Sequence, residues 1–220
     1  MTYQLIIFDW DGTLYDSAAY IVNCVQVAAA KQNLTPPEHH QIKQMIGLSP
    51  EKSLQRLMPD LSPMQSSKLI EDYQKCLLNP PHIKPTLFEG VEEILSNLSN
   101  QGYWMAIATS KGQRGLTADL QALNIGDYFI CQRCADQTQS KPHPQMVEEI
   151  LEELGVHPQD TVLIGDTEFD MLLADNAKVD AIAATYGVHN LSSLSQPTIR
   201  GYIKDIRELP ALLNHLKKYC

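Results

Sequence analysis

The spacing of hydrophobic positions changes twice along the chain. Tyr3–Phe8 is a compact apolar run that ends at the turn residues Asp11-Gly12, a pattern typical of a buried strand in a parallel sheet. Between about Ser17 and about Leu78 the chain reads as helices with no convincing strand between them. From Val91 onward, short apolar runs alternate with helical stretches. The pattern therefore predicts one strand, a helical block, and then a series of strands and helices.

Prolines mark several boundaries of the helical block. We expect its helices at Ala18–Lys31, from Pro36-Pro37 toward Ile46, at Pro50–Leu57 and at Pro63–Leu78. The segment Asn79–Pro85, with the sequence NPPHIKP, is expected to be a stiff proline-rich connector.

Strands and helices alternate after this connector. The expected helices are Val91–Asn100, Gln113–Leu123, Pro144–Leu154, Asp170–Lys178 and Leu209–Lys218. The expected strands are Trp104–Ala108, a strand near Tyr128–Cys131, Thr161–Ile164 and Ala181–Ala184. Such alternation implies right-handed crossovers and a doubly wound, mostly parallel sheet. The expected architecture is an α/β core of residues 1–16 and 84–220, with an all-helical domain of residues 17–83 inserted after its first strand.

Composition and charge limit the partners. Hydrophobic residues make up 44% and charged residues 20%, as in an ordinary globular protein. The formal net charge of -9 argues against sequence-independent binding to nucleic acid and against binding to an anionic membrane. An acidic protein can still bind phosphate locally if a metal ion and a lysine are present. The charge therefore restricts the partners more than the chemistry.

The cysteines and the start of the chain bear on the compartment. The start, MTYQLIIFDWDG, has no basic leader, and its apolar run is too short for a signal core or a membrane span. We therefore expect a cytoplasmic protein whose five cysteines are free thiols. Cys131 and Cys134 form a lone C-x-x-C, and without a second ligand pair at suitable spacing we expect no zinc site.

Polar residues follow the predicted strands. In open α/β sheets the binding crevice lies beyond the carboxyl ends of the strands. The residues expected there are Asp9 and Asp11 after the first strand, Thr109 and Ser110 after the second, Lys141 before a helix, and Asp166 with Asp170 after a later strand. Together they offer carboxylates, hydroxyls and one ammonium, which suits an oxygen-loving divalent cation and a phosphate.

Phosphoryl transfer gives Asp9 and Asp11 distinct expected roles. Asp9 can attack phosphorus and form an aspartyl-phosphate that water then hydrolyses. Asp11 can protonate the departing alkoxide as a general acid and then activate the water as a general base. Trp10, between them, should point away into the core because side chains alternate along an extended segment.

The remaining polar residues would hold the metal and the phosphate. Mg²⁺ prefers oxygen ligands, here Asp9, the backbone carbonyl of Asp11 and Asp166, with Asp170 binding the ion or orienting its waters. Mn²⁺ accepts the same ligands. Thr109 and the amide of Ser110 can donate hydrogen bonds to phosphate, and Lys141 adds a compact positive charge beside it.

In this order and at these strand ends, the residues resemble the motifs of the haloacid dehalogenase superfamily of phosphohydrolases. The matches are Asp9-Trp10-Asp11-Gly12-Thr13-Leu14 for the first motif, Thr109-Ser110 for the second, Lys141 for the third and Gly165-Asp166 with Asp170 for the fourth. The resemblance spans the whole chain and implies a Rossmann-like core with a small helical cap that closes over the site. It is closest to the phosphoglycolate phosphatase-like group.

The resemblance implies a Mg²⁺-dependent phosphomonoesterase that acts on a small phosphorylated metabolite, with 2-phosphoglycolate as the first candidate, as a monomer or a homodimer. A pyrophosphatase or nucleotidase of the same superfamily is an alternative. A catalytically idle interaction domain is another, although its expected mark, loss of Asp9, Asp11, Lys141 or Asp166, is absent. Asp11 argues against a true dehalogenase. Ile21 and Pro50 stand where a β-phosphoglucomutase would carry histidine and arginine.

Two further positions carry expectations. The cap loop at Gly47–Lys52 is the expected specificity element, with Lys43, Lys52 or Arg56 available to meet a substrate carboxylate. Lys178 follows Asn-Ala where the group usually has glycine. If that position requires a positive φ, lysine is an unusual occupant.

Overall fold

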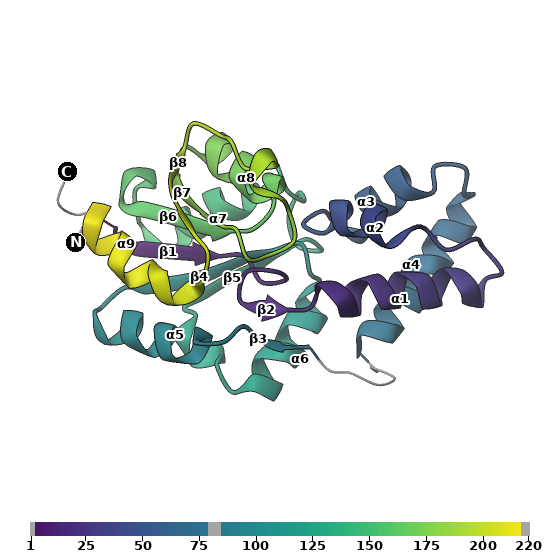
Figure 1. The fold of residues 1–220 in the computed structure, drawn as a ribbon, viewed down its shortest axis with the longest axis horizontal. Coiled ribbons are helices and arrows are strands. Elements are labelled where there is room, and N and C mark those ends of the chain that lie inside the picture. Colours follow the sequence, from purple (N-terminus) through teal and green to yellow (C-terminus); the bar gives the residue numbers. More distant parts are fainter. Residues whose placement is uncertain (1–2, 79–84, 217–220) are drawn as a thin grey trace.

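The computed structural model describes residues 3–78 and 85–216. The described chain forms two lobes that lie side by side, an α/β lobe and a lobe of helices α1–α4 (Figure 1). The predicted connector, apart from Pro85, and the end of the expected last helix lie outside the described residues. Within the described ranges, no helix combines the length and apolar character that crossing a bilayer requires.

The α/β lobe is built on a six-stranded parallel sheet with the order β5-β4-β1-β6-β7-β8. The strands are β5 (Cys131–Cys134), β4 (Trp104–Thr109), β1 (Leu5–Phe8), β6 (Thr161–Gly165), β7 (Asp180–Ala184) and β8 (Ile199–Ile203). The first strand in sequence therefore lies in the middle, between β4 and β6. This order confirms the predicted doubly wound, mostly parallel sheet.

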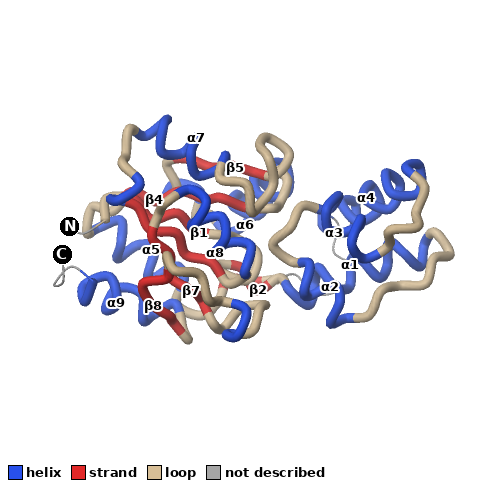
Figure 2. The backbone as a smooth tube through the Cα atoms, turned by 90° about the horizontal axis from the view of Figure 1, so that it is seen from above, coloured by secondary structure: helices blue, strands red, loops and turns tan. Residues whose placement is uncertain are grey.

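Helices cover both faces of the sheet (Figure 2). Side chains of β1 alternate between them, with Ile6 and Phe8 in one hydrophobic cluster and Leu5 and Ile7 in the other. The first cluster packs against α5 (Val91–Asn100), α6 (Gln113–Leu123) and α9 (Leu209–Leu216). The second packs against α7 (Gln145–Leu154) and α8 (Glu168–Ala177). Because both faces are buried, β1 reads as a continuous apolar run.

The helical lobe has a small core of its own. The lobe consists of α1 (Ala18–Lys31), α2 (His39–Met45), α3 (Pro50–Leu57) and α4 (Pro63–Leu78). The buried residues of its core are Ala28, Ala29, Leu54 and Leu69. Strands β2 (Tyr15–Asp16) and β3 (Thr86–Leu87) pair antiparallel and tie together the chain segments before and after this lobe. The division at residues 17 and 83 stays a prediction, and its second boundary lies outside the described residues.

The predicted strand near residues 128–131 is misplaced. Gly126–Tyr128 forms a turn of 3₁₀ helix, and the strand is β5, whose two middle residues are only partly buried. The apolar residue Phe129 is buried in the loop between them, so the hydrophobic run marks the loop and not the strand. Hydrophobicity alone could not find an edge strand of this kind.

Other differences also have local causes. Helix α2 begins at His39 and not at Pro36-Pro37, because Glu38 caps it and forms a capping box with Gln41. Helix α8 begins two residues earlier than predicted, after the cap residue Thr167. The pattern did not reveal β2 and β3, which have two residues each, or the edge strand β8.

Lys178, the residue after α8, has the positive φ that glycine at this position in related proteins suggested. Lys178 follows the helix with φ of 59° and ψ of 34°, in the left-handed region. Glycine adopts this conformation without the steric penalty that a Cβ causes. The chain therefore carries local backbone strain at Lys178.

We predict that Lys178→Gly stabilises the protein. Relief of the left-handed strain should raise the free energy of unfolding by about 1 kcal/mol, after the larger backbone entropy of glycine in the unfolded chain is subtracted. For a chain of this size the thermal midpoint should rise by about 2–4 °C. Lys178→Ala is the matched control and should change little, because alanine keeps the Cβ. Equal stability of the two variants would contradict this account.

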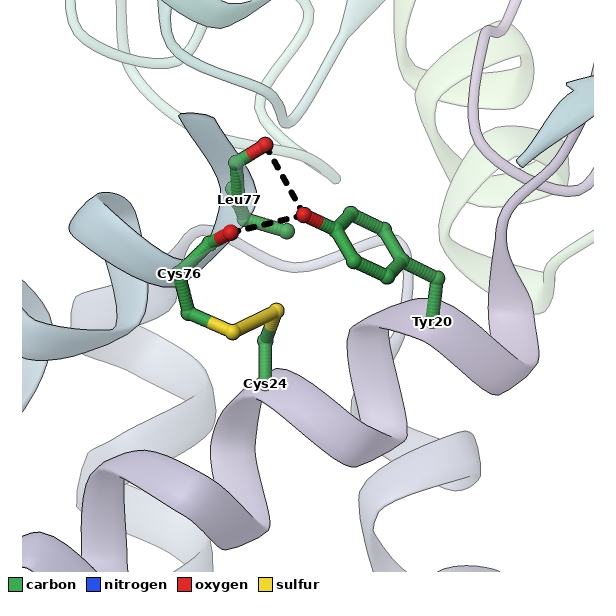
Figure 3. The surroundings of a disulfide bond; sticks show 4 residues. All are labelled: Tyr20, Cys24, Cys76 and Leu77. Atoms are coloured by element: carbon green, nitrogen blue, oxygen red, sulfur yellow. Dashed lines mark hydrogen bonds between the residues drawn. A yellow bond between two sulfur atoms is a disulfide. The ribbon is translucent and has the colours of Figure 1, made fainter. Parts of the chain in front are cut away.

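Two cysteines of the helical lobe form a disulfide. Cys24 on α1 and Cys76 on α4 are bonded with their Cα atoms 5.5 Å apart, and the Tyr20 hydroxyl donates to the carbonyls of Cys76 and Leu77 at 2.7 and 3.0 Å (Figure 3). The expectation that all five cysteines are free thiols is therefore wrong for this pair. The expectation came from the compartment alone, whereas packing of α1 on α4 joins cysteines 52 residues apart. Cys131 and Cys134 are free thiols.

We predict that reductant weakens the oxidised protein. Opening a bridge across 52 residues frees the unfolded chain, which by loop-closure entropy lowers the free energy of unfolding by up to about 4 kcal/mol. Urea denaturation with and without dithiothreitol would measure the shift. A variant with Cys24→Ser and Cys76→Ser should be insensitive to reductant. A wild-type midpoint that reductant does not move would contradict the prediction.

Candidate active site

Three neighbouring strands bring the predicted polar residues together. Asp9 follows β1, Thr109 ends β4 and Asp166 follows β6. Because β1 pairs with β4 on one side and β6 on the other, the carboxyl ends of these three strands lie next to one another at the C-terminal end of the sheet. The backbone amide of Asp9 also donates to the carbonyl of Ile164 at 2.9 Å. The centre of the sheet therefore positions the site.

A buried ion-pair cluster lies at this edge. The Nζ of Lys141 is 2.5 Å from Asp9 Oδ1 and 2.6 Å from Asp170 Oδ1, and the side chains of all three are buried. Burial raises the pKa of Asp9 to about 7, although Lys141 acts to lower it. Burial acts to lower the pKa of Lys141, but the charges of Asp170 and Asp9 outweigh it and the net direction is upward. Lys141 therefore stays charged.

Asp166 is held from two sides. Its Oδ1 accepts from the Thr13 hydroxyl at 2.7 Å, and its Oδ2 accepts from the backbone amide of Val188 at 2.8 Å. Burial and the neighbouring carboxylates Asp9 and Asp170 raise its pKa well above the usual range. Gly12 has φ of 98°, and a Cβ there would lie 2.3 Å from Asp166 Oδ2. Glycine is therefore required after Asp11 for the two strand ends to approach.

The donor set fits a divalent cation. Carboxylate oxygens of Asp9, Asp166 and Asp170 all lie within 4.8 Å of one another. Three carboxylates and the single ammonium of Lys141 leave an excess of two negative charges when all are ionised. Burial is the main cause of the raised pKa values of Asp9 and Asp166, and the neighbouring carboxylates add to it. A divalent ion would balance the excess charge, and an all-oxygen donor set suits Mg²⁺ or Mn²⁺.

Asp170 also supports the cluster structurally. Its Oδ2 accepts hydrogen bonds from the backbone amide and the hydroxyl of Thr167, the N-cap residue of α8, at 2.9 and 2.6 Å. Its Oδ1 accepts a hydrogen bond from Lys141. The same carboxylate thus holds both the lysine and the start of the helix.

Asp11 faces a cavity together with Asp9, Thr109 and Ser110. Its Oδ1 accepts from the Ser17 hydroxyl at 2.7 Å and lies 3.3 Å from the Nζ of Lys111. Trp10 is fully buried, as predicted, and points into the core.

Sequence reasoning assigned no role to Lys111 or Asp119. The Nζ of Lys111 lies 3.2 Å from Asp119 Oδ2, which also accepts from the indole of Trp10 at 3.1 Å. Lys111 directly follows Thr109-Ser110 at a strand end, so its place in the sequence gave a signal. Asp119 lies inside α6, and only the packing of that helix brings it here.

Contacts between the lobes close the site. The Ser110 hydroxyl donates to the carbonyl of Gly47 at 2.6 Å. The backbone amide of Ser49 donates to the Ser140 hydroxyl at 3.1 Å, and the Lys52 ammonium donates to the Ser140 carbonyl at 3.0 Å. The predicted specificity loop at residues 47–52 therefore rests directly on the core segments that carry Ser110 and Lys141.

The cations expected to meet a substrate carboxylate lie elsewhere. Lys52 binds core carbonyls, and the guanidinium of Arg56 lies 5.7 Å from the centre of the Phe169 ring. Lys43 is exposed on α2. The cavity beside Asp9 and Asp11 is lined by none of these three available cations.

Comparison with known proteins finds relatives over most of the chain. Residues 6–184 match the family model described as haloacid dehalogenase-like hydrolase. A protein of Dickeya dadantii named Probable phosphatase IndB is 33% identical over 196 residues, which cover 86% of this chain and 84% of that protein. A phosphoglycolate phosphatase of Vibrio vulnificus is 28% identical over 85% of this chain and 86% of its own length.

Solved structures agree in fold. A haloacid dehalogenase-like hydrolase from Bacteroides fragilis superposes with a TM-score of 0.88 at 24% identity, over 94% of this chain and 99% of that one. A hydrolase from Pseudomonas syringae has a TM-score of 0.83 at 26% identity, over 98% of both chains. The family match over most of the chain confirms the resemblance that the four motifs predicted. The chain belongs to the haloacid dehalogenase-like hydrolases.

Proposed function

We propose that this hydrolase is a Mg²⁺-dependent phosphomonoesterase that acts through an aspartyl-phosphate on Asp9. The observation that carries the proposal is the buried cluster of Asp9, Lys141, Asp166 and Asp170 directly behind a cavity that Asp9 and Asp11 line. The phosphatase names of the curated relatives support it.

Asp9 is the proposed nucleophile. One carboxylate oxygen forms a bond to phosphorus while the bond from phosphorus to the substrate oxygen breaks. Lys141, 2.5 Å from Asp9 Oδ1, keeps a positive charge beside the reacting carboxylate and the incoming phosphate. Thr109 and the backbone amide of Ser110 are the proposed hydrogen-bond donors to the phosphoryl oxygens.

Asp11 is the proposed general acid and base. Its proton passes to the departing alkoxide, and the resulting carboxylate then takes a proton from the water that hydrolyses the aspartyl-phosphate. Ser17 and Lys111 both contact its Oδ1 and hold the side chain at the cavity wall. The cap would exclude bulk water during these steps.

The proposed metal ligands are Asp9, the backbone carbonyl of Asp11 and Asp166, with Asp170 as ligand or support. When bound, Mg²⁺ neutralises charge on the phosphate oxygens. The hydroxyl of Thr13 and the backbone amide of Val188 orient the carboxylate of Asp166 toward the proposed metal site.

The proposed substrate is a small phosphorylated metabolite. The names of several relatives make 2-phosphoglycolate the first compound to test. Pyrophosphate and nucleotides are the alternatives within the superfamily. An idle interaction domain is disfavoured because the cluster is complete. The cytoplasmic location and the monomeric or dimeric state stay predictions.

We predict that Asp9→Asn reduces phosphate release to below about 10⁻⁴ of wild type, because the amide is a poor nucleophile. Asp11→Asn should lower kcat by about 10²–10⁴-fold through loss of proton transfer. Phosphate release from p-nitrophenyl phosphate, 2-phosphoglycolate, pyrophosphate and nucleotides would measure both. Asp16→Asn, which changes an exposed aspartate of β2, is the matched control and should keep wild-type activity. Near wild-type rates from Asp9→Asn would refute the nucleophile assignment.

We predict that metal binding both activates and stabilises the protein. Chelation by EDTA should abolish turnover, and Mg²⁺ at about 100 times its dissociation constant should add about 2.7 kcal/mol to the free energy of unfolding. Thermal unfolding with and without Mg²⁺ measures the second effect independently of activity. In Asp166→Asn the stabilisation should be largely lost. A wild-type protein that Mg²⁺ neither activates nor stabilises would remove the metal from the proposal.

A further inference from the structure

The cavity between the lobes is larger than a phosphate and a short acid require. It has a volume of about 470 Å³ and extends from Asp9 and Asp11 along the cap helices. Pockets of roughly 300–1,000 Å³ accommodate drug-sized ligands. Most of its lining residues belong to the cap, where the leaving alcohol would lie with the phosphate seated at Asp9.

Most of the cap side of the cavity is apolar, and its polar lining residues are Ser53, Glu71, Gln74 and Lys75. All four cap helices contribute large hydrophobic side chains, among them Ile21 and Val25 of α1, Met45 of α2, Leu54 and Leu57 of α3, and Tyr73 of α4. A charged group placed against such a wall would lose its hydration without gaining a partner. An apolar or aromatic body would instead bury its surface there.

The cations that line the cavity do not favour an anionic leaving group. The ammonium of Lys111 is shared by Asp11 at 3.3 Å and Asp119 at 3.2 Å, so two carboxylates already face one positive charge. A substrate carboxylate next to Asp11 would meet this local excess of negative charge.

Two other cations of the lining lie at the surface. Lys75 is exposed and pairs with Glu71 of the same helix. Arg114 is exposed on α6. Water and salt screen exposed charges, so neither supplies a buried site for a carboxylate.

The geometry points to a substrate whose leaving group is an uncharged alcohol with an apolar or aromatic body. This inference rests on the proposed phosphomonoesterase function. The ionic end, with Asp9, Lys141 and Asp166, takes the phosphate, and the cap wall takes the body of the alcohol. Aromatic monoesters and nucleoside monophosphates belong to this class, whereas 2-phosphoglycolate and pyrophosphate carry a second anionic group and rank below them.

A matched pair of esters tests the inference. Benzyl phosphate and 4-carboxybenzyl phosphate share the same reacting oxygen and differ by one carboxylate remote from it. We expect kcat/KM to be at least about tenfold higher for benzyl phosphate, a difference of about 1.4 kcal/mol in transition-state binding. We expect 2-phosphoglycolate to be poorer than benzyl phosphate as well. Equal or higher kcat/KM for either carboxylated ester would overturn the inference.

A cap variant shows whether the wall sets this preference. Met45→Lys places a cation on the apolar side, and Met45→Gln is the neutral control. Met45→Lys should raise the relative kcat/KM for 4-carboxybenzyl phosphate severalfold, and Met45→Gln should not. An unchanged ratio in Met45→Lys would contradict a role of the wall in selection.

The outcomes separate the two proposals. Phosphate release that depends on Asp9 but favours carboxylated esters would leave the phosphatase proposal standing and overturn the substrate class. If that preference disappeared in Arg114→Gln, Arg114 would be the anion site. No release from any ester by the folded protein with Mg²⁺ would overturn both.

Discussion

The contact of Lys141 with Asp9 and Asp170 is the interaction on which the site depends. It joins the end of β1, the loop before α7 and the start of α8 through one buried ammonium. Removal of that charge would leave buried carboxylates without a counter-ion, which is strongly unfavourable. The same requirement explains why the cluster suits a divalent cation: one lysine cannot balance three neighbouring carboxylates.

The two lobes divide the work around this cluster. The core supplies charge and hydrogen-bond donors at the sheet edge, where the central position of β1 gathers residues from both neighbouring strands. The cap supplies apolar walls, and its loop rests on the core through the bonds of Gly47, Ser49 and Lys52. Phosphate and alcohol would therefore meet different environments, one ionic and one hydrophobic. The Cys24–Cys76 disulfide joins α1 and α4, which both line the hydrophobic part.

Several features were predictable because their physical cause is local. Helices α1, α3, α4, α5 and α6 have the predicted bounds, since periodicity, caps and prolines act within a few residues. The resemblance raised the question of a positive φ at Lys178, because the group usually has glycine at that position, and the structure shows a positive φ there. Strand β5 was misplaced because an edge strand lacks a continuous apolar run, and the disulfide was missed because its partners are 52 residues apart.

By itself, the sequence determined the fold class, the order of the motifs and the residues gathered at the strand ends, because a parallel sheet sends all those ends to one edge. Only the tertiary structure decided which charged side chains contact one another and which ones face the cavity. Asp119 reaches Lys111 through the packing of α6, and Lys52 and Arg56 turn toward the core and away from the cavity. These contacts depend on how distant elements dock, and docking is set by packing across the whole molecule. No local pattern of residues records it.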